Sequence, residues 1–147
     1  MLATDDPAIA LAVQTADCVP VLLADRRGRA VAAVHAGWRG TMLGIARRGV
    51  GVLVAEFGAR PEDLVAAVGP SIGPCCYQVG REMRQAFLDA GHAPDHVDRW
   101  FSSHTTPPIG VRLDLWRATS DQLIDAGLDP AQIHVAGLCT ATGGDLF

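Results

Sequence analysis

The sequence predicts a layered α/β domain with a mixed β-sheet. Six apolar segments have the length of buried strands: residues 9–13, 19–24, 29–35, 64–68, 111–113 and 133–138. Three segments space their apolar residues as helices do: residues 41–57, 80–90 and 115–126. Strands that alternate with helices are typical of an α/β architecture. With 147 residues, 49% of them hydrophobic, residues 1–147 are expected to form a single domain.

The strands at 19–24 and 29–35 are expected to form an antiparallel pair. Residues 25–28 between them read DRRG, a turn sequence that ends in glycine. Strands joined by so short a turn run in opposite directions, which makes the sheet mixed. Their apolar runs do not alternate with polar residues, and this favours strands covered on both faces.

Glycines shape the first helix, predicted over residues 41–57. Gly49 and Gly51 weaken it, and Gly58 is placed to end it. The strand at 64–68 then runs into a loop rich in proline and glycine.

The second half of the chain is expected to hold two helices and two short strands. The helix at 80–90 ends before Gly91, and residues 91–108 are expected to form a loop because they lack periodicity. Asp114 is placed to cap the helix at 115–126.

Composition excludes several classes of function. The chain has 16 acidic and 12 basic residues, a net charge of −4, which argues against a nucleic-acid partner. All its bases are arginine, so a phosphate-binding or Schiff-base lysine is excluded. No apolar run approaches the roughly 18 residues of a membrane span, and the first residues are acidic where a signal peptide is basic. The sequence therefore predicts a cytoplasmic protein with no membrane partner.

The four cysteines, Cys18, Cys75, Cys76 and Cys139, are expected to be free thiols. The chain lacks a C-x-x-C pair and does not resemble a small secreted domain. Cys75 and Cys76 are adjacent, and adjacent cysteines rarely reach disulfide geometry.

The most informative pair is Cys18 and His35, at the outer ends of the predicted hairpin. If the turn is centred between Arg26 and Arg27, these two residues face each other with Cβ atoms about 4.5–5.5 Å apart. A thiolate and an imidazole at that separation can bind one zinc ion. They can equally form a nucleophile and its base, or simply be buried side chains.

Residues near this pair suit an anionic substrate. Arg39 lies between glycines just before a predicted helix, where a guanidinium group and free amides can bind an anion. It can instead pair with Asp17. Trp38 can cover an aromatic substrate or pack in the core.

The segment 69–77, GPSIGPCCY, is a second candidate site. It can bring backbone amides or the thiols of Cys75 and Cys76 to the end of the sheet where α/β domains bind ligands. It can instead be a rigid loop with only a structural role. Cys139 ends the last strand and can face the same site. His92, His96 and His104 are expected on the surface and His134 in the core.

These segments together carry a family resemblance. Residues 15–21 (TADCVPV), 34–40 (VHAGWRG), 69–77 (GPSIGPCCY) and 137–140 (GLCT) resemble, in the right order, motifs of the YfiH/YlmD family. This family is also called the laccase-domain or multicopper polyphenol oxidoreductase family. The resemblance implies a layered α/β/α fold with a mixed sheet, like that of cysteine hydrolases.

The resemblance also implies a function. Family members are described as zinc-dependent enzymes that phosphorolyse adenosine, inosine and methylthioadenosine and deaminate adenosine. It implies Cys18 and His35 as metal ligands, Asp17 as an orienting or proton-carrying group, and Arg39 as the phosphate site. Trp38, Cys75 and Cys76 are then candidates for substrate binding, and the partners are a purine nucleoside and phosphate.

The resemblance leaves three alternatives open: an amidase for a peptidoglycan precursor with Cys18 as nucleophile, a copper polyphenol oxidase, and an inactive fragment. Five histidines are few for coupled copper centres, so zinc is favoured over copper. The family's third ligand, a histidine, precedes the region matched here, and an arginine-rich motif follows it. The sequence is therefore expected to be truncated at both ends. It does not predict the oligomeric state.

Overall fold

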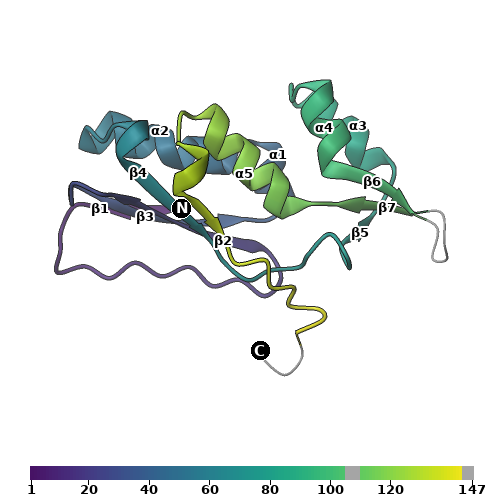
Figure 1. The fold of residues 1–147 in the computed structure, drawn as a ribbon, viewed down its shortest axis with the longest axis horizontal. Helices are drawn as coiled ribbons and strands as arrows, with labels where there is room; N and C mark the ends of the chain where they lie inside the picture. The colour runs from purple at the N-terminus through teal and green to yellow at the C-terminus, as the bar shows by residue number, and fades with distance from the viewer. Residues whose placement is uncertain (105–109, 144–147) are drawn as a thin grey trace.

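In a computed structural model that describes residues 1–104 and 110–143, the chain forms two β-sheets flanked by helices (Figure 1). The larger sheet has the strand order β1-β3-β2-β4-β8. Its strands are β1 (Leu2–Thr4), β2 (Val19–Asp25), β3 (Val31–Ala36), β4 (Leu64–Val68) and β8 (Ile133–Val135). β4 and β8 are parallel and the other neighbours antiparallel, which confirms the α/β class and the mixed sheet.

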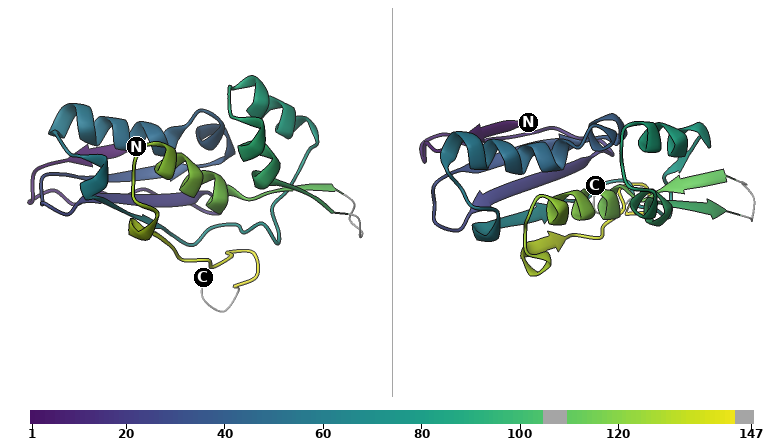
Figure 2. Two further views of the ribbon diagram at one scale, coloured as in Figure 1. Left: turned by 45° about the horizontal axis from the view of Figure 1, so that its top comes forward. Right: turned by 90° about the horizontal axis from the view of Figure 1, so that it is seen from above.

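Three helices lie along one face of this sheet, α1 (Trp38–Met42), α2 (Ile45–Phe57) and α5 (Leu115–Asp125) (Figure 2). They bury the inward side chains of the sheet in a core that includes Val21, Leu23 and Leu53. Leu22, which points the other way, is 54% exposed. The expectation of strands covered on both faces is therefore wrong for β2, whose outer face is only partly covered.

The opposite face is partly covered by chain without regular structure. Residues 5–18 contain no helix or strand and pass along this face (Figure 1). Leu11 and Val13 share a groove of about 360 Å³ with Pro20 and Leu22 of β2. The strand predicted at residues 9–13 is thus wrong, because this segment passes the outer face of β2 without pairing with a strand.

A smaller antiparallel sheet has the strand order β5-β7-β6. Its strands are β5 (Gln78–Val79), β6 (Phe101–His104) and β7 (Gly110–Leu113), and it is accompanied by α3 (Glu82–Asp89) and α4 (Pro94–Trp100). The loop predicted over 91–108 is wrong where the chain is described, and residues 105–109 lie outside that part. Pro94 begins α4, and Trp100, at its end, packs edge-to-face on Phe87 with ring centroids 6.0 Å apart.

The helix predicted over 41–57 is two helices. Gly44 takes a left-handed conformation (φ 72°) that separates α1 from α2. Gly58 ends α2 as predicted, and Asp114 caps α5 by accepting a hydrogen bond from the Arg117 amide. Two single turns of 3-10 helix precede strands β4 and β8: η1 (Pro61–Asp63) and η2 (Pro130–Gln132). No helix in the described ranges has the length and apolar character that a bilayer span requires.

Candidate active site

Several loops meet at one edge of the larger sheet. β2 begins at this edge, while β3, β4 and β8 end there, because β2 is antiparallel to β3 and β4 and β8 is parallel to β4. The Ile72 amide donates to the Asp17 carbonyl (2.8 Å) and the Thr140 amide to the Ser71 carbonyl (3.1 Å). These bonds fasten the loop before β2, the loop after β4 and the segment after β8 into one platform.

Cys18 and His35 both border Gly37 at this edge. The hairpin pairs Pro20 with His35, so Cys18 lies two residues beyond the position opposite the histidine. The predicted register is therefore wrong, because four residues separate the hydrogen-bonded pair Asp25 and Ala30 at the turn.

The two side chains nevertheless come together. A Cβ atom placed on Gly37 would lie 2.8 Å from Cys18 Sγ and 3.9 Å from His35 Nε2. The space that this glycine leaves empty is therefore bordered by a sulfur and an imidazole nitrogen.

A small pocket of about 130 Å³ opens beside Cys18. It is lined by Asp17, Cys18, Ile72, Tyr77 and Leu115.

The Tyr77 hydroxyl in this pocket has a raised pKa. Burial is the main cause, the negative charge of Cys18 raises the pKa further, and Arg39 opposes both. Ile72 and Tyr77 belong to the segment 69–77 that was predicted as a second candidate site, although neither was singled out, and Leu115 was not predicted as a site residue. Tyr77 directly follows Cys75 and Cys76 in the 69–77 motif, and this position in the sequence could have identified it as a residue of the pocket.

Asp17 is held in place by its neighbours. Thr140 donates a hydrogen bond from Oγ1 to Asp17 Oδ1 at 2.6 Å, across 123 positions of sequence. The carboxylate thus lies at the mouth of the pocket with one oxygen anchored, as an orienting group requires. Its role in catalysis stays a prediction.

Arg39 is exposed and lies inside α1, which begins at Trp38 rather than after the arginine. Its guanidinium carbon sits 4.4 Å from the centre of the Trp38 ring, a cation–π contact. Asp17, the predicted alternative partner, is bonded to Thr140 instead. The Trp38 ring is half-buried against the core and positions the Arg39 guanidinium group, which was expected to bind an anion.

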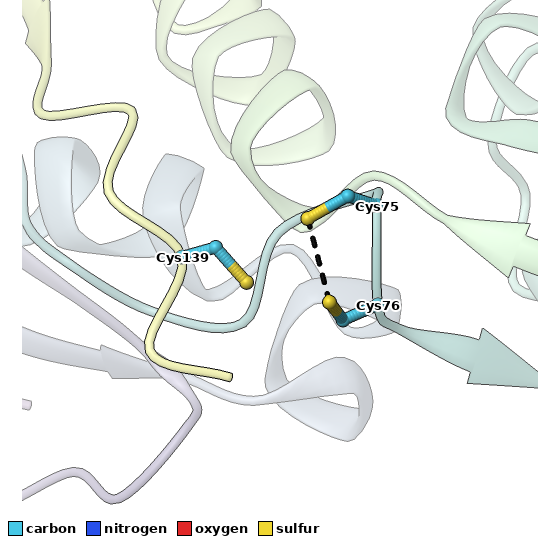
Figure 3. Close-up of side chains that lie close together, drawn as sticks. All are labelled: Cys75, Cys76 and Cys139. Atoms are coloured by element: carbon cyan, nitrogen blue, oxygen red, sulfur yellow. Dashed lines mark hydrogen bonds between the residues drawn. The ribbon is translucent and has the colours of Figure 1, made fainter. Parts of the chain in front are cut away.

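The other three cysteines form a separate cluster, shown in Figure 3. The sulfur atoms of Cys75, Cys76 and Cys139 all lie within 4.8 Å of one another, and those of Cys75 and Cys76 are 3.5 Å apart. All four thiols are free, as predicted. Cys75 and Cys76 point toward Cys139 and do not line the pocket beside Cys18, and their predicted contact with substrate stays a prediction.

Ionisation differs sharply within this cluster. Burial alone would raise the pKa of Cys139, but hydrogen bonds from the Gly73 amide, Thr142 and Ala141 outweigh it and lower that pKa to about 6. The hydrogen bond with Cys75, with added burial, raises the pKa of Cys76 to about 11. Near neutral pH, Cys139 is therefore a thiolate and Cys76 a thiol.

The remaining histidines are spread over the fold. His92 contacts the Met42 carbonyl oxygen through Nε2 at 2.8 Å and lies against Trp100. His96 is 3.4 Å from Asp125. His134 is exposed, so its predicted place in the core is wrong. His104 ends β6.

A mixed sheet that presents a thiol, an imidazole and a carboxylate at one edge defines an α/β protein with a thiol–imidazole site. The chain matches, over residues 1–147, the family described as multi-copper polyphenol oxidoreductase laccase, and it belongs to that family.

Curated relatives and solved structures of the same family cover nearly all of this chain. A purine nucleoside phosphorylase of Bacteroides thetaiotaomicron is 37% identical over 99% of the chain and 53% of that protein. The purine nucleoside phosphorylase YfiH of Escherichia coli is 34% identical over 98% of the chain and 54% of that protein. The crystal structure of YlmD from Geobacillus stearothermophilus has a TM-score of 0.85 at 35% identity and matches 99% of this chain and 52% of that one. The chain thus spans about half the length of these relatives.

Proposed function

We propose that this chain carries the active site of a zinc-dependent purine nucleoside phosphorylase that also deaminates adenosine. Its substrates would be adenosine, inosine and methylthioadenosine, with phosphate as the second substrate. The observation that supports this most is the meeting of Cys18 and His35 beside Gly37, next to the pocket. The names of the relatives, purine nucleoside phosphorylase, support the same reaction.

The donor atoms beside Gly37 suit zinc. A cysteine sulfur and an imidazole nitrogen are standard zinc ligands, at about 2.3 Å and 2.0–2.1 Å from the ion. Within the described ranges, no third histidine, cysteine or acid joins these two in a cluster. Cys18 and His35 would therefore supply two corners of a tetrahedral site, and solvent or a residue outside those ranges the others. When bound, zinc supplies a Lewis acid that lowers the pKa of a coordinated water.

The chain's own side chains have distinct roles in this proposal. In phosphorolysis, a phosphate oxygen bonds to the anomeric carbon while the bond from that carbon to the purine nitrogen breaks. Arg39 would bind the phosphate, and Asp17, anchored by Thr140, would orient the purine or carry the proton that the leaving base takes up. Trp38 would lie against the substrate while it holds Arg39.

The direct test is turnover by the 147-residue chain in the presence of zinc. Inosine with phosphate should give hypoxanthine and ribose 1-phosphate, and adenosine should also give inosine and ammonia. Cys18→Ser should lose both reactions, while Arg84→Ala, which removes an exposed ion pair outside the pocket, should keep them. Equal turnover in Cys18→Ser and the parent would overturn the proposal.

The same thiol–imidazole pair also suits a different chemistry, an amidase with Cys18 as nucleophile. Metal dependence separates the two functions. The phosphorylase should lose activity in a chelator and regain it with zinc. A Cys18 amidase should cleave an amide of a peptidoglycan precursor in chelator, and iodoacetamide should block it. Oxidation of a phenol in the presence of added copper would instead support the polyphenol oxidase. The absence of turnover with every substrate would support the inactive fragment.

A further inference from the structure

The cluster of Cys75, Cys76 and Cys139 is not explained by the proposed nucleoside chemistry. Its sulfurs converge on one point, with the Cys75–Cys76 separation at 3.5 Å and every separation within 4.8 Å. Three sulfurs bound to one ion at about 2.3 Å lie about 3.8–4.0 Å apart. Each separation in the observed triangle is therefore within about 1 Å of the value in such a metal site.

The backbone around the cluster is fixed before any metal arrives. Ser71, fully buried, forms an isolated parallel bridge with Cys139 and binds the segment after β8 through the Leu138 carbonyl and the Thr140 amide. The loop that carries Cys75 and Cys76 is thus pinned to the loop that carries Cys139. Such a constraint reduces the ordering that metal binding requires.

Gly73 adds a donor to the sulfur of Cys139. Its amide donates a hydrogen bond to Cys139 Sγ at 3.2 Å, the kind of contact that stabilises a metal-bound thiolate. A Cβ atom at Gly73 would lie 2.7 Å from Trp116 Cη2 and 3.2 Å from Cys139 Cβ. Only glycine lets this amide come so close, while Trp116, bonded through Nε1 to Ser71 Oγ at 2.6 Å, closes one side.

The donor set selects the metal. All three ligand atoms are sulfur, and within the described ranges no histidine or acid belongs to the group. Soft thiolate ligands favour Cu(I), Zn²⁺ and iron–sulfur clusters. A closed structural zinc site and an iron–sulfur cluster take four protein ligands, and zinc at three thiolates would need a fourth ligand from solvent. Cu(I) is commonly three-coordinate, so three thiolates complete its coordination. Cys139 is buried and Cys75 exposed, so an ion can enter from the Cys75 side.

We propose that Cys75, Cys76 and Cys139 form a three-thiolate site for a Cu(I) ion, separate from the Cys18–His35 pair. Binding replaces the thiol protons with the metal and involves no electron transfer. The site does not depend on the nucleoside chemistry, because none of its ligands lines the pocket beside Cys18.

The test is a Cu(I) competition titration in the Cys18→Ser chain, so that only the cluster contributes thiols. The protein is kept without oxygen in a phosphine reductant and titrated with Cu(I) against bicinchoninate, whose copper complex is coloured. Cys18→Ser should withhold one equivalent of copper from the chelator. Cys18→Ser/Cys75→Ser and Cys18→Ser/Cys139→Ser should each bind copper at least about tenfold more weakly.

Two controls keep the result decisive. Cys75 is exposed, so its serine variant should fold even if the buried Cys139→Ser does not, and circular dichroism checks both. Copper retention that is unchanged in the Cys75 variant, or absent from Cys18→Ser itself, would overturn the proposal. Uptake of zinc without Cu(I) by Cys18→Ser would overturn the choice of metal.

Discussion

At the scale of single residues, Gly37 controls the space between the two predicted zinc ligands. Its backbone is extended (φ −77°, ψ 171°), so alanine can adopt the same conformation. A methyl group there would approach Cys18 Sγ to 2.8 Å and displace it from His35. Gly37→Ala should therefore fold normally yet bind zinc about 10–100-fold more weakly, as measured by competition with a coloured chelator. Unchanged zinc affinity in a folded Gly37→Ala would mean that the metal does not lie beside this glycine.

The low pKa of Cys139, about 6, gives a pH dependence in the metal-free protein. An unfolded cysteine ionises near pH 8.5. Because folding lowers the pKa, the thiolate contributes stability that is present above about pH 8.5 and is lost as pH falls through about 6. The ultraviolet absorbance of thiolate should rise with a midpoint near pH 6, and Cys139→Ser should lack this step. The absence of any step below pH 7.5 in the parent would contradict the expectation.

Sequence patterns identified the segments that carry the site, but not the individual contacts between distant segments that complete it. Cys18 and His35 follow from a hairpin, whose register was wrong but whose strand ends still meet. Tyr77 reaches Cys18 only because the loop after β4 crosses the start of β2, and Thr140 reaches Asp17 from the far end of the chain. The clustering of Cys139 with Cys75 and Cys76 was expected, because Cys139 ends the last predicted strand, and it depends on the parallel pairing of β4 with β8.

At the scale of elements, two glycines of α2 should respond in opposite ways to alanine. A Cβ atom on Gly51 would meet nothing within 4 Å, whereas one on Gly49 would lie 3.1 Å from Val34 Cγ2 and 3.2 Å from Leu23 Cδ1. Gly51→Ala should raise the free energy of unfolding by about 0.5–1 kcal/mol, through helix propensity alone. Gly49→Ala should lower it by about 1–3 kcal/mol, because the core is overpacked. Urea unfolding of both variants measures the difference, and an equal gain in both would show that the core has room beside Gly49.

The elements that were mispredicted have two physical causes, contacts with distant segments and one left-handed glycine. Residues 9–13 are apolar enough for a strand, but they cover the outer face of β2 as irregular chain. α4 has little periodicity over its seven residues, and tertiary contacts of Trp100 and Val97 in the core stabilise it. Gly44 divides one apolar pattern into two helices through its left-handed backbone. For residues 9–13 and α4 the deciding contacts come from distant segments, whereas Gly44 acts locally, and the helical spacing around it hid this break.

At the scale of the whole molecule, Trp100 and Asp121 join the unit built on the smaller sheet to the helices of the larger one. Trp100, at the end of α4, is 1% exposed and donates from Nε1 to Asp121 Oδ2 of α5 at 2.8 Å. Trp100→Phe keeps a ring in the core but leaves this buried carboxylate without its indole donor, which should cost about 1–3 kcal/mol.

A matched surface contact provides the control for this join. Arg84 and Asp98 form an exposed ion pair between α3 and α4, and Arg84→Ala should cost less than about 1 kcal/mol. Urea unfolding followed by circular dichroism measures both variants. If the join couples the two parts, the parent unfolds in one transition, and Trp100→Phe shifts its midpoint more than Arg84→Ala does. Equal shifts would mean that apolar packing of the Trp100 ring, and not its hydrogen bond, holds the two sheets together.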